Sequence, residues 1–216
     1  MILKRLQLKT EWVDKTNCYI IQDEDTREAI IIDPASELEK IEEMLNILGV
    51  KLKYIYLTHC HADHIGVATG LHNKYGAKIL IHRNGAENLE KDEVVLNEYI
   101  GTEKIVLEAD SRIDDDDLLH IGNLEFKVLH TPGHTNCSTS LYSEEHKMIF
   151  SGDTIFRGAW GRTDLPTSSF EDIIKSITDK IMVLPDDTII YPGHGKSTIV
   201  KEEKPIYIDL KPRLDY

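Results

Sequence analysis

The sequence predicts an α/β (α+β) fold in which strands and helices alternate in two rounds. Ile2–Leu8 alternates apolar and polar residues, as a strand with one buried face does. Residues 38–48 instead place leucine or isoleucine at 38, 41, 45 and 48, the spacing of one helix face. Because both patterns recur in the second half of the chain, we expect two β-rich halves, each followed by helices.

Length and composition favour a single domain. The chain has 216 residues, 41% of them hydrophobic, which suffices for one substantial core, and no shift in composition marks a boundary. We therefore expect residues 1–216 to form one domain. The formal charge of −13 argues against a nucleic-acid partner, because phosphate binding depends on lysine and arginine. No apolar run approaches the roughly 18 residues that cross a membrane, so we expect no membrane partner.

The three cysteines, Cys18, Cys60 and Cys137, are an odd number without the Cys-x-x-Cys spacing of a zinc knuckle. They indicate no disulfide framework, and the N-terminus lacks the continuous apolar stretch of a secretion signal. We therefore expect a protein of the reducing cytoplasm. The sequence leaves its oligomeric state unknown.

The first half is expected to open with a β-meander and to continue as a βαβ-like unit. Its expected strands are residues 2–8, 17–22, 29–32, 54–57 and 78–81. Asp33-Pro34 ends the third strand, Ser36 can cap the helix over 38–48, and Gly49 stops that helix. A second helix is expected over residues 65–75.

The second half is expected to contain two hairpins, a helix and a last strand. Its expected strands are residues 118–121, 124–129, 138–142, 148–150 and 188–191. Periodic isoleucines predict a helix across residues 168–181, and residues 84–101 are expected to hold only short helical pieces. The four aspartates at 114–117 lack the spaced ligands of a calcium loop, so we expect a solvated turn.

Residues 58–64 read Thr-His-Cys-His-Ala-Asp-His and place three imidazoles and one carboxylate directly after a strand. Neutral imidazole and carboxylate together suit zinc, iron, manganese or a similar divalent ion. His59 and His61 lie two apart and point to the same side of an extended segment, whereas Cys60 points away. Asp63 and His64 come after the turn and can reach a second ion beside the first.

Three later loops offer further ligands, each beside a glycine and each after a strand-like run. They contain His134 in Thr-Pro-Gly-His-Thr, Asp153 in Ser-Gly-Asp-Thr and His194 in Pro-Gly-His-Gly. Glycine lets backbone and side chain approach an ion closely. His72 and His82 lie outside these motifs, and we expect them to be solvent or packing histidines.

The order and spacing of these motifs resemble the metallo-β-lactamase superfamily, and within it the glyoxalase II-like hydrolases. The resemblance runs from residue 17 to His194, and Gly-Arg-Thr-Asp-Leu-Pro at 161–166 is typical of the short members of that branch. It implies an αββα four-layer sandwich: two mixed sheets face to face, helices outside and metals at one edge. It also implies one ion held by His59, His61 and His134, a second held by Asp63, His64 and His194, and Asp153 as the bridge.

By this resemblance the cofactors are two divalent metal ions (Zn, Fe or Mn), and the chemistry is hydrolysis. Such ions share a water, lower its pKa towards roughly 7 and polarise a substrate carbonyl. The expected reaction is attack of a metal-bound hydroxide on a small thioester of the hydroxyacylglutathione type, with Asp63 and Asp153 as catalytic carboxylates. A thiol nucleophile is disfavoured, because Cys60 and Cys137 have no base partner beyond histidines already assigned to metal.

The substrate itself is less sharply defined. Glyoxalase II enzymes carry a further helical domain whose basic residues help hold glutathione, whereas here 22 residues follow His194, so the thiol partner stays open. Arg162 aligns roughly with a substrate-contacting basic residue of the longer enzymes. It can pair with a substrate carboxylate, or it can fix its loop through a salt bridge with Asp164, and the sequence does not choose.

Two other functions remain compatible with the sequence. Persulfide dioxygenases resemble residues 58–64 and 161–164 closely, yet use one iron bound by two histidines and one aspartate, here His59, His134 and Asp153. Against them, residues 192–195 look more like the hydrolases. A non-enzymatic metal-binding member of the fold is the third candidate, but it would have little reason to keep seven ligands, since an unpaired buried carboxylate costs several kcal/mol.

Overall fold

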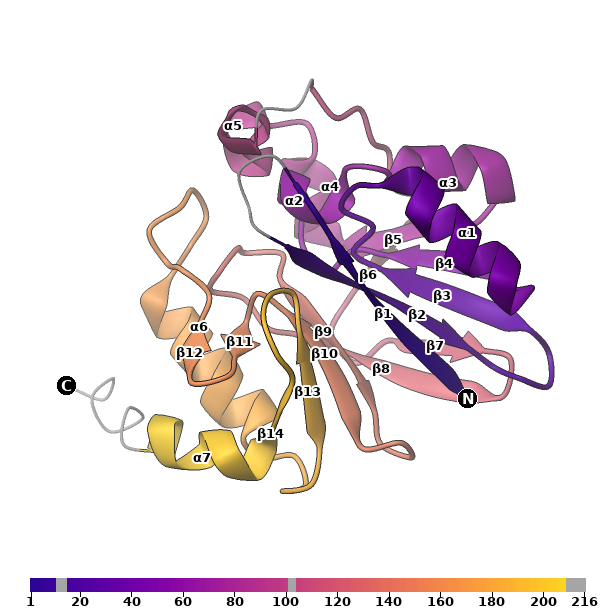
Figure 1. The fold of residues 1–216 in the computed structure, drawn as a ribbon. Coiled ribbons are helices and arrows are strands. Elements are labelled where there is room, and N and C mark those ends of the chain that lie inside the picture. Colours follow the sequence, from indigo (N-terminus) through magenta and orange to yellow (C-terminus); the bar gives the residue numbers. More distant parts are fainter. Residues whose placement is uncertain (11–14, 101–103, 209–216) are drawn as a thin grey trace.

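The structure, a computed structural model, describes residues 1–10, 15–100 and 104–208. Two mixed six-stranded sheets lie face to face in this part of the chain, with helices on their outer sides (Figure 1). No helix within these ranges is long and apolar enough to cross a membrane. The expected αββα sandwich is confirmed, and its layers follow from the two halves of the sequence.

The first sheet is formed by the N-terminal half, in the order β1-β2-β3-β4-β5-β6. Its strands are β1 (Ile2–Leu8), β2 (Thr16–Gln22), β3 (Glu28–Ile32), β4 (Lys51–Tyr56), β5 (Lys78–His82) and β6 (Ser111–Ile113). The first three strands pair antiparallel, as expected for a β-meander, and β3 to β6 pair parallel. Parallel neighbours need crossover connections, and the helices α1 (Leu38–Leu48) and α3 (Ala68–Tyr75) lie on two of them.

The second sheet is formed by the C-terminal half, in the order β14-β13-β10-β9-β8-β7. Its strands are β7 (Leu118–Ile121), β8 (Leu124–His130), β9 (Thr139–Ser143), β10 (Met148–Gly152), β13 (Ile189–Pro192) and β14 (Thr198–Ile199). Only β10 and β13 pair parallel among these strands. The helix α6 (Phe170–Ser176) and the π-helical turn η2 (Ile177–Ile181) lie on their crossover.

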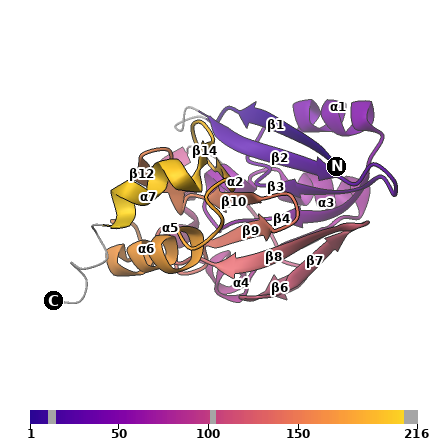
Figure 2. The same cartoon turned by 90° about the horizontal axis from the view of Figure 1, so that it is seen from below.

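Three clusters of buried apolar side chains separate the four layers. Along β2, Cys18 and Ile20 pack towards α1 and α3, whereas Tyr19 and Ile21 pack between the sheets, because alternate residues of a strand face opposite sides. A third cluster joins the second sheet to α6, η2 and the C-terminal helix α7 (Val200–Ile208). In Figure 2, α6 and α7 lie across the strands from α1. Burial on both faces explains why every residue of β2 is buried.

The shorter elements lie mainly in the loops. They are α2 (Ala62–Ile65), α4 (Arg83–Asn88), α5 (Asp92–Val95), the 3₁₀ turn η1 (Asn97–Ile100), β11 (Ile155–Phe156) and β12 (Ala159–Trp160). The short helical pieces expected over 84–101 are confirmed for the described residues. The aspartates at 115–117 are exposed, as expected for a solvated turn.

Two local expectations are wrong. The helix expected over residues 65–75 is interrupted between α2 and α3, because Val67 donates its amide to the Pro34 carbonyl and not to the preceding turn. Ser36 does not cap α1: its hydroxyl donates to the Lys9 carbonyl at 2.7 Å, and Glu37 holds the cap position without a side-chain bond. The hairpin β11–β12 was not expected, since strands of two residues carry no periodic signal.

Candidate metal centre

The seven expected ligands lie in loops that follow the carboxyl ends of four strands. The motif at residues 58–64 follows β4, His134 follows β8, Asp153 follows β10 and His194 follows β13. Because the two sheets are packed face to face, these loops meet at one edge of the sandwich. The structure brings all seven side chains into adjoining groups of possible metal ligands.

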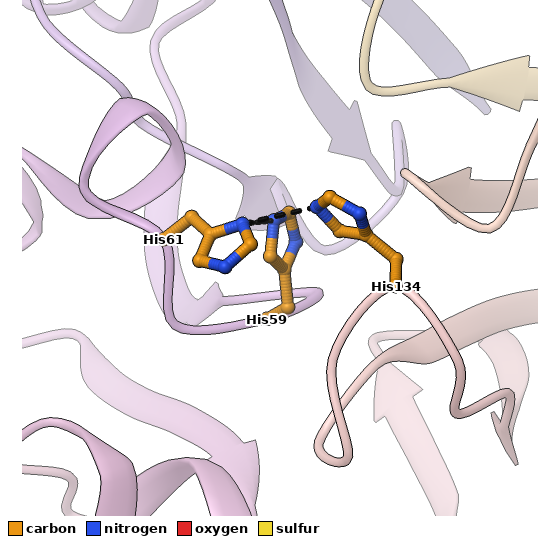
Figure 3. Close-up of side chains that lie close together, drawn as sticks. All are labelled: His59, His61 and His134. Carbon is orange, nitrogen blue, oxygen red and sulfur yellow. Dashed lines mark hydrogen bonds between the residues drawn. The ribbon is translucent and has the colours of Figure 1, made fainter. Parts of the chain in front are cut away.

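The first group consists of His59, His61 and His134, whose rings face one another from two different loops (Figure 3). His61 Nδ1 lies 3.1 Å from His59 Nε2 and 3.0 Å from His134 Nε2. All three residues are buried, with at most 3% of their surface exposed. One ion could therefore contact three inward-facing nitrogens at once.

The second group consists of Asp63, His64 and His194. His64 Nε2 lies 3.2 Å from His194 Nε2, and Asp63 Oδ2 lies 3.4 Å from His194 Nε2. Aspartate and two histidines form a mixed oxygen and nitrogen donor set of the kind that suits divalent transition metals. The group draws two residues from the first half of the chain and one from the second.

Asp153 lies between the two groups. Its Oδ2 is 3.6 Å from His134 Nε2 and 3.4 Å from His194 Nε2, and its Oδ1 is 3.5 Å from His64 Nε2. This position fits the bridging ligand that the sequence resemblance implies. Gly193 packs so closely here that a Cβ atom would overlap Asp153 Oδ1 and lie 2.8 Å from His64 Cε1, so a side chain at this position would displace the ligands.

Hydrogen bonds at the outer ring nitrogen orient four of the five histidines. The Nδ1 atoms of His134 and His194 each lie 2.9 Å from a carbonyl oxygen, those of Arg162 and Lys15. His59 Nδ1 lies 3.0 Å from the Thr58 hydroxyl, and His64 Nδ1 lies 2.9 Å from Asp33 Oδ2. Since oxygen at Nδ1 favours a proton there, each neutral ring keeps the Nε2 lone pair directed into the cluster.

Asp33 is a supporting residue that the sequence reasoning missed. Its Oδ1 accepts the Thr58 amide at 2.8 Å, and its Oδ2 accepts the Thr58 hydroxyl at 2.7 Å as well as His64 Nδ1. The residue is 1% exposed, and its backbone has a positive φ of 53°. The available signal is an aspartate directly after a buried strand that neighbours the motif strand, but this position alone predicts only the end of a strand.

Asn17 and Tyr19 of β2 hold the loop that carries His194, although they lie more than 170 residues earlier in the chain. The Asn17 side-chain amide donates to the carbonyls of Pro192 at 2.9 Å and Gly195 at 3.0 Å, and the Tyr19 hydroxyl donates to the Pro192 carbonyl at 2.7 Å. The Asn17 backbone amide donates to the Gly193 carbonyl at 2.7 Å. Together these bonds fix the loop that presents His194 against the first sheet.

The polar atoms of the cluster suit a cation. Asp153 Oδ1, a buried atom between the two groups, has no hydrogen-bond partner within the described residues, although such atoms normally find one. Inward nitrogens 3.0–3.2 Å apart also cannot all be acceptors without a positive species between them. A divalent ion in each group would satisfy both conditions.

The electrostatics differ between the two groups. Burial holds the pKa of His59 well below its usual range and lowers the pKa of His61 to about 3, so both rings are neutral and ready to bind metal. Burial also disfavours the charged form of His194, but Asp153 beside it raises the pKa of that ring to about 10. Binding of an ion at the second group must therefore displace protons.

The remaining candidates lie around the cluster. Cys60 and Cys137 are fully buried in the apolar cluster between the first sheet and its helices, and their sulfur atoms contact each other at 3.5 Å. Contact with Cys137 raises the pKa of the Cys60 thiol. Arg162 makes a paired salt bridge with Asp164, with Nε to Oδ1 at 2.7 Å and Nη2 to Oδ2 at 2.9 Å. The loop-fixing alternative is thus present in the structure.

Two further histidines lie outside the cluster, as expected. His82 is buried and its ring stacks on that of His130, with centroids 4.0 Å apart. His72 Nδ1 lies 3.0 Å from the Ala77 carbonyl. His82 is thus held by packing between the two halves of the chain, and His72 by a hydrogen bond within the first half.

Comparisons with known proteins agree with this geometry. The Haemophilus influenzae hydroxyacylglutathione hydrolase GloC is 35% identical over 190 residues, covering 87% of this chain and 89% of its own. The human mitochondrial persulfide dioxygenase ETHE1 is 32% identical over 212 residues, covering 94% of this chain and 73% of its own.

Solved structures show the same likeness. The crystal structure of the BLEG-1 B3 metallo-beta-lactamase superposes with a TM-score of 0.87 at 31% identity, covering 94% of this chain and 97% of that one. The di-iron-bound form of TTHA1623 superposes with a TM-score of 0.81 at 27% identity, covering 93% and 96%. The sequence profile of the metallo-beta-lactamase superfamily matches residues 12–194. With this match and the His/Asp cluster at the sheet edge, the chain belongs to the metallo-β-lactamase superfamily of metal-dependent hydrolases and related enzymes.

Proposed function

We propose that residues 1–216 form one metallo-β-lactamase-like domain that acts in the cytoplasm as a binuclear metal-dependent hydrolase, cleaving a small thioester of the hydroxyacylglutathione type. The observation that carries the proposal is the completeness of the second ligand group. Asp63, His64 and His194 lie within reach of one ion, and Asp153 can serve this group and the first one together. The similarity to GloC supports the thioester substrate.

Two divalent ions held in these groups would lower the pKa of a shared water towards about 7 and polarise a substrate carbonyl. The chain contributes position and charge: Asp63 and Asp153 each place a carboxylate oxygen 3.4 Å from His194 Nε2. We assign these two residues as the catalytic carboxylates. A thiolate leaves readily without proton donation, which suits a cluster whose five histidines are all candidate metal ligands. Arg162 remains a proposed substrate contact.

A persulfide dioxygenase that uses one iron is the second candidate, because the similarity extends to human ETHE1. Such a site would use His59, His134 and Asp153. It would leave Asp63 and His194 without a metal to bind, although both lie with His64 in a group that could hold one ion. The two functions therefore differ in their dependence on the second group.

The deciding experiment is a paired assay on metal-analysed protein. Thioester cleavage is followed by release of free thiol from a lactoylglutathione-type substrate, and persulfide oxidation is followed with an oxygen electrode and glutathione persulfide. We expect thiol release and no oxygen uptake. Asp63→Asn serves as the matched variant, because it alters the second group and keeps His59, His134 and Asp153. It should lose thiol release by at least about tenfold if two ions share the work. Iron-dependent oxygen uptake without thiol release, unaffected in Asp63→Asn, would instead support the dioxygenase.

A further inference from the structure

The short hairpin β11–β12 borders both halves of the metal centre. At one end, the Phe156 ring lies 6.1 Å from the His194 ring, centroid to centroid. At the other end, Gly161 lies so close to the His134 ring and the Asp153 backbone that a Cβ atom would overlap the Asp153 carbonyl oxygen. The next residue, Arg162, accepts the His134 Nδ1 hydrogen through its backbone oxygen. The hairpin thus spans the centre from the second ligand group to the first.

The hairpin is too small to hold this position alone. Each strand has two residues, joined by the turn at Arg157-Gly158, and isolated two-stranded hairpins are marginal even when longer. Its position must therefore be fixed by neighbouring elements. The Ser151 hydroxyl donates to the Ile155 carbonyl at 3.0 Å and holds the start of β11. The hydrogen bonds that hold the turn and β12 come from α7, which begins six residues after His194.

Two buried side chains of α7 bond to the backbone of the hairpin. Glu203 Oε2 accepts the Gly158 amide at 2.9 Å, and the Tyr207 hydroxyl donates to the Ala159 carbonyl at 2.7 Å. Glu203 is 2% exposed and Tyr207 is fully buried, with its ring 6.1 Å from that of Trp160. A buried carboxylate is costly unless hydrogen-bonded, and the other oxygen of Glu203 accepts the Thr198 hydroxyl at 2.6 Å. Both oxygens of this carboxylate thus accept hydrogen bonds within the protein.

We infer that α7 positions one wall of the substrate site: Glu203 and Tyr207 hold the β11–β12 hairpin against the metal centre, so that Phe156 and the backbone before Arg162 border the bound thioester. The inference rests on the proposed function for its substrate. Both residues are positioning residues, since neither contacts the ligand cluster. The helix α7 thereby acquires a role in substrate binding.

The test compares Glu203→Ala and Tyr207→Phe with two controls. Glu203→Gln can still accept the Gly158 amide and donate to the Thr198 hydroxyl, so it should rescue the loss. Lys201→Ala truncates an exposed side chain of the same helix. We expect KM for the thioester to rise about tenfold in Glu203→Ala, because this variant loses the carboxylate that accepts from both Gly158 and Thr198. The rise should be smaller in Tyr207→Phe, which loses one hydrogen bond between uncharged groups. Metal content and kcat should change much less, and both controls should match the wild type.

Hydrogen exchange of the peptide spanning residues 155–162 provides a reading that needs no substrate. It should quicken in Glu203→Ala and Tyr207→Phe and remain unchanged in the controls. Unchanged exchange in both variants, or loss of metal in step with the rise in KM, would overturn the inference. If Glu203→Ala fails to fold, Tyr207→Phe decides, because it removes one hydroxyl and keeps the ring. If the wild-type protein does not cleave thioesters, only the proposed function is contradicted. Hydrogen exchange of residues 155–162 would still test whether α7 holds the hairpin.

Discussion

Asp33 differs from the other residues that orient the cluster histidines, because it presents a carboxylate to His64 where the others present a carbonyl or a hydroxyl oxygen. A carboxylate behind a metal-binding histidine fixes its tautomer and raises its basicity. Asp33→Asn should therefore weaken binding of the ion at the second group by about 10–100-fold, with a smaller effect at the first.

Competition with a coloured chelator measures this change, since it resolves the two binding steps. Asp23→Asn is the matched control: Asp23 is also a buried carboxylate with several hydrogen bonds, but its partners Thr26 and Asn123 lie outside the metal centre. Equal weakening of both ions, or of neither, would contradict the assignment of Asp33 to His64.

Cys60 lies between two candidate ligands, yet it packs in the apolar cluster of the first sheet, where its sulfur contacts that of Cys137. Cys60→Ala should therefore leave metal content and activity nearly intact, at a stability cost of about 1 kcal/mol for the small cavity. His59→Ala and Asp153→Ala should lose metal and activity together. Elemental analysis beside the thioester assay checks all three variants. Loss of metal in Cys60→Ala as complete as in His59→Ala would show that the alternation along this segment has been misassigned.

At the scale of elements, the sequence was most informative where the signal is local. The bounds of β1 and α1 follow from the periodicity of about ten consecutive residues or fewer. The candidate ligands His59, His61, Asp63 and His64 come from six residues in the loop after β4. The supporting contacts could not be predicted in this way. Asn17 bonds to a loop 175 residues later, and Glu203 to a hairpin 45 residues earlier, so only packing of the two sheets brings these partners together.

The bond between β2 and the His194 loop can be tested by Tyr19→Phe. This change removes the hydroxyl that donates to the Pro192 carbonyl and keeps the ring that packs on Phe150. We expect a loss of about 1 kcal/mol in stability, the usual value for one buried hydrogen bond. The second ion should also dissociate faster, because the His194 loop is less firmly held. Stopped-flow chelation measures the dissociation rates of the two ions separately. The control is Tyr142→Phe, which lies on β9 and away from the His194 loop. An unchanged dissociation rate of the second ion in Tyr19→Phe would show that the hydrogen bond from β2 does not affect metal binding.

His82 joins the two sheets, since it ends β5 and stacks on His130 at the end of β8. Burial is the main cause that lowers the pKa of His82 to about 4. Because this folded-state pKa lies below the ordinary value near 6.5, the stabilisation is complete above pH 6.5 and is lost as the pH falls towards 4. The loss should be on the order of 2–3 kcal/mol.

His82→Asn isolates this contribution. Asparagine can still accept the Asn84 amide that His82 Nδ1 accepts at 3.2 Å, but it does not titrate. Urea unfolding of both proteins between pH 7 and pH 4, with metal kept constant, should show wild-type stability falling more steeply than that of the variant. Parallel pH profiles would mean that His82 does not carry the expected proton linkage.

At the scale of the whole molecule, the metal centre ties the two halves of the chain together. Each ligand group combines residues that follow β4 with residues that follow strands of the second sheet. Ions bound only by the folded state stabilise it by mass action, by about 4 kcal/mol when free metal exceeds the dissociation constant a thousandfold. Removal of metal should therefore lower the melting temperature by on the order of 10 °C in a chain of this size.

The measurement is a melting curve of chelated protein during stepwise return of Zn, Fe or Mn, with bound metal counted by elemental analysis. We expect two increments that end near two ions per chain, because the second group is complete and shares Asp153 with the first. Asp63→Asn is the control that should show the first increment and a weakened second one. If the wild type saturates at one ion and reaches its full melting temperature there, the binuclear centre is excluded. A single stabilising ion would then place His59, His134 and Asp153 at the functional site and remove the main physical argument for hydrolysis over persulfide oxidation.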